Sequence, residues 1–171
     1  MNFAAIKLAD CANGLGVRTV LFVSGCRHHC KGCFQPETWN FDYGKPYTEE
    51  TEQYLLSSMD NAWTDGLTLL GGEPMEPENQ AVVVNLIKKT KAMGKNVWLY
   101  SGYTFEELTD EGNKRCHGEH TMEILKNIDV LVDGEFHEEE KDITLKFRGS
   151  ANQRVINMPE TLRSGHITNL F

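Results

Sequence analysis

Short apolar runs, each closed by glycine or a polar turn, alternate along this chain with segments of helical spacing. Runs rich in β-branched and other apolar residues predict strands. The predicted strands are 17–24, 67–70, 96–100 and 130–132, with two later candidates at 143–147 and 154–157. Threonine or proline followed by acidic residues marks the predicted helix starts. The predicted helices are 48–60, a long one from Pro77 to a stop at Gly94, a short one from Thr104, and 121–126.

Strands that alternate with helices predict a parallel sheet with right-handed crossovers. A complete eightfold α/β barrel usually needs about 250 residues, and this chain has 171. We therefore expect residues 1–171 to form a single α/β domain with a mostly parallel sheet, either a partial α/β barrel or a small open sheet.

Ligands of both architectures bind at the carboxyl ends of the strands. Four polar or glycine-containing segments follow predicted strands of this chain: 26–33, 71–74, 101–103 and 133–135. Because the ends of parallel strands share one edge of a sheet, these segments are expected to converge on one site.

Charge and length exclude several classes of function. With 17 basic and 25 acidic residues, the net charge is −8, which argues against nucleic-acid binding and against attraction to anionic lipid. No apolar stretch approaches the roughly 20 residues of a membrane span. Lys7 and Asp10 interrupt the apolar core that a signal peptide needs, so we expect a cytoplasmic protein. Five cysteines, an odd number, fit reduced thiols.

Cys26, Cys30 and Cys33 form a C-x3-C-x2-C segment after the first predicted strand. Three thiolates on one short loop suit a single inorganic cofactor. Structural zinc takes four ligands, and the fourth would come from one of His28, His29 or Cys11. A 4Fe-4S cluster also ordinarily takes four cysteines. Three cysteines therefore predict one iron left free for an exogenous ligand, with a zinc-binding interaction module as the alternative.

The side chains around this motif carry weaker signals. Between the first two cysteines, His28 and His29 are expected to be exposed polar spacers rather than hydrogen-bonding partners of a metal site. Cys11 is expected to be a buried free thiol. Cys116 lies in a polar loop and suggests no role.

Together with Gly71-Gly72-Glu73-Pro74, the cysteine motif resembles the radical S-adenosylmethionine superfamily. Segments 10–18, 21–26 and 148–154 are similar, more narrowly, to the activating proteins of anaerobic (class III) ribonucleoside-triphosphate reductases. The resemblance implies a partial α/β barrel of the radical S-adenosylmethionine type. One departure is Gly32, where many superfamily members carry an aromatic residue.

The resemblance also implies a set of ligands. Cys26, Cys30 and Cys33 would bind three irons of a 4Fe-4S cluster, and S-adenosyl-L-methionine would chelate the fourth. The residues implied to contact that cofactor are Gly32 or Phe34 at the adenine, Gly71, Gly72 and Glu73 at the methionyl part, and Ser101 and Asp133 at ribose or methionyl groups. Ser101 and Asp133 equally fit roles as turn or cap residues.

The implied reaction is reductive cleavage of S-adenosyl-L-methionine to methionine and a 5′-deoxyadenosyl radical, with an electron from a flavodoxin-like donor. That radical would take a hydrogen atom from a backbone glycine of the large catalytic subunit of anaerobic ribonucleotide reductase. Segment 148–154 would either frame the docking surface or carry solvated charges. The alternatives are an activase of another glycyl radical enzyme, such as pyruvate formate-lyase, and the zinc-binding module.

Overall fold

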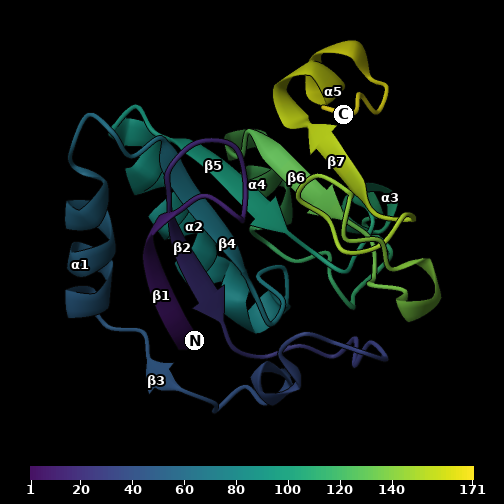
Figure 1. Cartoon of the computed structure of the whole chain (residues 1–171), viewed down its shortest axis with the longest axis horizontal. Helices are drawn as coiled ribbons and strands as arrows, with labels where there is room; N and C mark the ends of the chain where they lie inside the picture. The colour runs from purple at the N-terminus through teal and green to yellow at the C-terminus, as the bar shows by residue number, and fades with distance from the viewer.

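Seven strands form one open sheet in the computed structural model, which describes residues 1–171 (Figure 1). The strand order is β3-β1-β2-β4-β5-β6-β7. The strands are β1 (Asn2–Asp10), β2 (Arg18–Val23), β3 (Lys45–Pro46), β4 (Gly66–Gly71), β5 (Asn96–Tyr100), β6 (Val130–Asp133) and β7 (Arg154–Asn157). The four central strands β2, β4, β5 and β6 are parallel, as predicted. The edges are antiparallel, so the sheet is mixed, and the prediction of a mostly parallel sheet holds only for its centre.

Five α-helices connect and flank these strands. They are α1 (Glu49–Met59), α2 (Pro77–Ala92), α3 (Phe105–Thr109), α4 (Thr121–Asn127) and α5 (Met158–Ser164), with short 3-10 turns at Pro36–Trp39 and Glu138–Glu140. The predicted start signals act as expected. Thr48 and Thr104 each accept a backbone N–H in a capping box, and Pro77 occupies the first turn of α2. Helix α5, which follows β7 directly, was not predicted. No helix is long and apolar enough to span a membrane.

The two faces of the sheet have different neighbours. Leu21, Leu69 and Leu99 belong to the main apolar core, which includes the buried faces of α1, α2 and α4. Their sequence neighbours in β2, β4 and β5 point to the opposite face, because side chains alternate along a strand. There Phe22, Leu70 and Tyr100 line a cavity instead of packing under helices. The helices therefore leave this face free for a ligand.

One strand prediction is wrong, and strands β1 and β3 were not predicted. Segment 143–147, predicted as a strand, is a turn, because the Asp142 carboxylate accepts hydrogen bonds from the N–H and hydroxyl of Thr144. Phe147 there has a left-handed backbone and packs its ring against Trp98. Strand β1 was missed because Phe3 is its one buried residue, so the segment lacks a strong apolar pattern.

Candidate cluster and cofactor site

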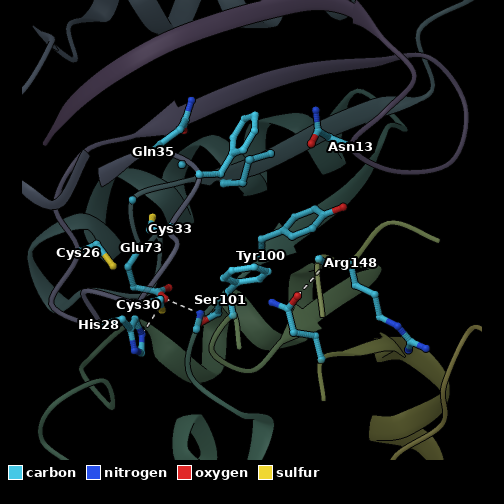
Figure 2. Close-up of a pocket in the computed structure, with 18 of the residues that line it drawn as sticks. Asn13, Cys26, His28, Cys30, Cys33, Gln35, Glu73, Tyr100, Ser101 and Arg148 are labelled. Carbon is cyan, nitrogen blue, oxygen red and sulfur yellow. Dashed lines mark hydrogen bonds and ion pairs between the residues drawn. The ribbon is translucent and has the colours of Figure 1, made fainter. Parts of the chain in front are cut away.

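A cavity of about 560 Å³ lies at the carboxyl ends of the parallel strands. It is lined by most of the residues singled out from the sequence: Cys26, Cys30, Gly32, Cys33, Phe34, Gly71, Gly72, Glu73 and Ser101. Figure 2 shows the three cysteines gathered with Glu73 and His28 on one side of the cavity, and Arg148 on the other. Segments separated by many residues in the chain thus meet at one place, as the strand-end argument predicts.

Close backbone contact fixes the cysteine loop against the loop after β4. The Gly72 N–H donates to Val23 O (2.7 Å) and the Glu73 N–H donates to Gly25 O (2.8 Å). A Cβ atom on Gly72 would lie 2.7 Å from Gly25 O, which is too close for any side chain. Gly25 itself has φ of +94°, a conformation that glycine adopts without strain. Glycines at these positions let the two loops touch directly.

Two thiols of this loop, those of Cys26 and Cys30, favour their protonated form when no metal is bound. Burial, with the charge of Glu73 nearby, raises the pKa of Cys26 to about 12. Burial also raises the pKa of Cys30. A cation must displace these protons, because thiolates are the metal-binding form of cysteine. None of the five cysteines forms a disulfide, so all three loop thiols are available.

The donor set fits an iron–sulfur cluster. Soft thiolates suit iron–sulfur chemistry, and each of three irons needs one cysteine. Three thiols that line one cavity form a donor set that such a cluster can use.

Glu73 turns its carboxylate into the protein. Its side chain is 1% exposed, and its two oxygens accept hydrogen bonds from the N–H groups of Met75 (2.9 Å) and Gly102 (2.7 Å). His28 Nε2 lies 3.2 Å from the oxygen that Gly102 also binds. The carboxylate therefore ties together the loops after β4 and β5 and the cysteine loop.

His28 is not the exposed spacer that the sequence predicted. Its side chain is 3% exposed, with Nδ1 2.6 Å from Glu135 Oε1 and Nε2 facing Glu73. Burial alone would lower the pKa of His28, but the hydrogen bonds and charges of the two glutamates raise it above its ordinary value. His29 is exposed as expected, with its ring stacked on Trp39 at a centroid distance of 4.6 Å.

Ser101 and Asp133 make local contacts within the chain. Ser101 lines the cavity, and its hydroxyl accepts a hydrogen bond from the N–H of Tyr103 (3.1 Å). Asp133 does not line the cavity. Its buried carboxylate pairs with Arg154 and accepts the N–H of Phe105 at the start of α3 (2.7 Å). These contacts favour the turn and cap roles for both residues.

Three further predicted residues lie in contrasting surroundings. Phe34 is 96% exposed at the edge of the cavity. Cys11 is exposed, so the expectation of a buried thiol was wrong for it. Cys116 is fully buried in the main core.

The cavity also has lining residues that the sequence analysis did not assign, among them Asn13, Phe22, Leu70, Tyr100, Phe136 and Arg148. Phe22, Leu70 and Tyr100 could have been found from the sequence. Side chains alternate between the two faces of a strand, so every second residue of β2, β4 and β5 must point away from the face that the helices cover. Asn13 and Arg148 lie within segments that carried the family resemblance, but the neighbouring sequence does not indicate that their side chains point into the cavity.

Comparison with known proteins places residues 12–156 in the family of 4Fe-4S single cluster domains. A protein of Vibrio cholerae is 41% identical over 90% of this chain and 96% of its own length. One of Enterobacteria phage T4 is 39% identical over 91% and 93%, and one of Escherichia coli K12 is 35% identical over 91% and 97%. All three are named anaerobic ribonucleoside-triphosphate reductase-activating protein.

Proposed function

Because this chain belongs to the family of anaerobic ribonucleoside-triphosphate reductase-activating proteins and contains a 4Fe-4S single cluster domain, we propose that it generates the glycyl radical of an anaerobic ribonucleotide reductase. The observation that carries the proposal is the shared cavity, in which the three loop thiols face the Gly71–Glu73 segment. An iron–sulfur cluster and a small organic cofactor need adjoining sites of this kind.

When bound, the reduced cluster and S-adenosyl-L-methionine supply a one-electron cleavage to methionine and a radical able to take hydrogen from a backbone glycine of the large reductase subunit. Cys26, Cys30 and Cys33 hold three irons in this proposal. Gly71 and Gly72 let the backbone approach the methionyl part, since they place no side chain between it and the cavity. The electron comes from a flavodoxin-like donor.

Phe34 or the backbone at Gly32 borders the adenine in this proposal. Both line the cavity beside Cys33, and an adenine ring stacked on Phe34 would cover an aromatic side chain that is otherwise in water. Ser101 lines the same cavity, so its hydroxyl is available to a ribose or methionyl group. Asp133 acts only indirectly, by holding the start of α3.

The finer architecture that we propose is a partial barrel of the radical S-adenosylmethionine type. Its helices cover one face of the sheet, and Phe22, Leu70 and Tyr100 line the other. The sheet is not closed. An open side admits a segment of another protein to the cavity, which a protein substrate requires.

The decisive test is anaerobic reconstitution of the full chain with iron and sulfide, followed by reduction with dithionite. We expect an electron paramagnetic resonance signal of a reduced 4Fe-4S cluster that changes when S-adenosyl-L-methionine is added, and 5′-deoxyadenosine as a product. Colourless protein that binds zinc and releases no deoxyadenosine would instead establish the zinc-binding module.

Variants of single cysteines sharpen this test. Cys26→Ala, Cys30→Ala and Cys33→Ala are each expected to abolish deoxyadenosine formation, because each removes the anchor of one iron. Cys11→Ala is the matched control, since Cys11 is exposed and does not line the cavity. Full activity of any loop variant would refute the ligand assignment.

Activation of pyruvate formate-lyase is the second candidate within the same chemistry. The shared name of the relatives favours the reductase. Mixing the loaded protein with the large reductase subunit or with pyruvate formate-lyase under reducing conditions separates the two, because the glycyl radical signal forms only on the true substrate.

A further inference from the structure

His28 lies at the junction of three segments that surround the cavity. Its ring sits between Glu73, from the loop after β4, and Glu135, from the segment after β6. The turn after β5 closes on the same ring. Gly102 donates its N–H to the Glu73 oxygen that His28 faces, and Tyr103 packs its ring on the imidazole at a centroid distance of 4.2 Å.

The fit around this ring is tight. A Cβ atom on Gly102 would lie 2.6 Å from His28 Nε2, so the turn after β5 has room for the imidazole only because residue 102 is glycine. With 3% of its side chain exposed, the ring has little freedom to turn. The ring therefore holds a fixed position between Glu73, which is 1% exposed, and Glu135, which is 42% exposed.

Neither ring nitrogen is free to bind a metal. Nδ1 faces Glu135 and Nε2 faces Glu73, whereas a histidine ligand offers one nitrogen to its metal. This arrangement argues against His28 as a fourth ligand of zinc or of a cluster. The residue lies between two cluster cysteines but directs its hydrogen bonds to the segment proposed for the organic cofactor.

We propose that His28 is a positioning residue, which fixes the Gly71–Glu73 loop against the cysteine loop so that S-adenosyl-L-methionine spans both. The inference rests on the proposed function. Glu73 is the link, since its backbone N–H binds Gly25 O beside the cysteines and its carboxylate binds His28 and Gly102. Without the imidazole, a buried carboxylate oxygen loses a partner, and the loop that carries the two glycines loses a constraint.

Three variants test the proposal. His28→Leu removes both hydrogen bonds while keeping an apolar side chain in the slot, and His28→Gln keeps an amide N–H that can donate to Glu73. His29→Leu is the matched control, because His29 lies on the same loop but is exposed. The readouts are iron and sulfide per chain, the melting temperature of the metal-free protein, and the dissociation constant of S-adenosyl-L-methionine from titration of the electron paramagnetic resonance signal.

We expect His28→Leu to load iron and sulfide like the unmodified protein but to bind S-adenosyl-L-methionine about tenfold more weakly. His28→Gln should recover part of the loss, and His29→Leu should match the unmodified protein. A His28→Leu affinity within about twofold of the unmodified protein would overturn the proposal, since a lost hydrogen bond to a buried charge weakens binding by more.

If His28→Leu fails to fold or to take up a cluster, His28→Gln decides. A loaded His28→Gln protein with weakened cofactor binding supports the proposal, and one with unchanged binding refutes it. Loss of the cluster in both variants also refutes it, because His28 would then support the metal loop alone. Failure of the proposed function is distinguishable, since the unmodified protein itself would neither bind nor cleave S-adenosyl-L-methionine.

Discussion

Individual cysteines of this chain differ sharply in their surroundings. Cys116 is fully buried, and its thiol donates to Glu107 O (3.4 Å). Burial, with the charge of Glu107, raises the pKa of Cys116 to about 11. Cys11 is exposed. Because the thiolate is the reactive form, burial and the raised pKa both make Cys116 unreactive in the folded protein.

We predict that iodoacetamide at pH 8 modifies Cys11 in the folded, metal-free protein and leaves Cys116 untouched. Three units below its pKa of about 11, Cys116 is about one-thousandth thiolate, and its reactivity should rise as the pH approaches that value. Peptide mass spectrometry measures both sites. In denaturant the two should react alike, and rapid labelling of Cys116 in the folded protein would contradict its placement in the core.

At the scale of single residues, the spacing of the cysteines predicted part of the cavity lining. The burial of other side chains depends on contacts with residues far away in the sequence. The convergence of Cys26, Cys30 and Cys33 on one cavity was predictable because three thiols in eight residues at a strand end have few other structural uses. The burial of His28 was not, since its partners lie 45 and 107 residues away in the sequence. An exposed spacer and a buried link between two glutamates have the same local sequence.

Among the elements, β6, β7 and α3 meet at Asp133. Its carboxylate pairs with Arg154 at the start of β7 and accepts the N–H of Phe105 in the first turn of α3. The side chain is 1% exposed. Arg154 also reaches Glu106 on α3, which is 60% exposed. The ion pair of Arg154 with Asp133 is therefore shielded from water on the carboxylate side, whereas its ion pair with Glu106 is exposed to solvent.

We predict that Asp133→Ala lowers the free energy of unfolding by ~2–4 kcal/mol, because it leaves Arg154 and a helix N–H without their buried partner. Glu106→Ala is the control, with an expected cost of at most about 1 kcal/mol for an exposed ion pair. Urea unfolding followed by circular dichroism measures both. Equal midpoints for the two variants would mean that Asp133 does not link these elements.

The predictability of the elements follows the same physics. Central strands buried on both faces show as apolar runs, so β4 was predicted at 67–70 and found at Gly66–Gly71. The starts of α1, α2 and α3 were visible because their capping residues and the proline of α2 are local signals, whereas the Asn157 cap of α5 was overlooked. Strand β1 and the turn at 143–147 were not visible, since the pairing of β1 with β2 and β3 and the packing of Phe147 on Trp98 arise only in the folded chain.

For the molecule as a whole, the open sheet separates two tasks. Helices on one face supply the core, and the opposite face with the strand ends forms the cavity. Segment 141–149 contributes to the edge of that cavity and carries Ile143, which is 92% exposed. A large apolar side chain in water at the edge of a cavity is a candidate contact for a protein substrate.

We therefore predict that Ile143→Asp slows glycyl radical formation on the large reductase subunit about tenfold, the effect of losing one buried aliphatic contact and adding a charge. Cleavage of S-adenosyl-L-methionine with dithionite and no partner should stay unchanged, since Ile143 belongs to no loop proposed to hold either cofactor. Trp63→Asp is the control, because Trp63 is exposed but does not line the cavity. Equal radical yields from both variants would place the docking surface elsewhere. Loss of partner-free cleavage in Ile143→Asp would instead assign this turn to the cofactor site.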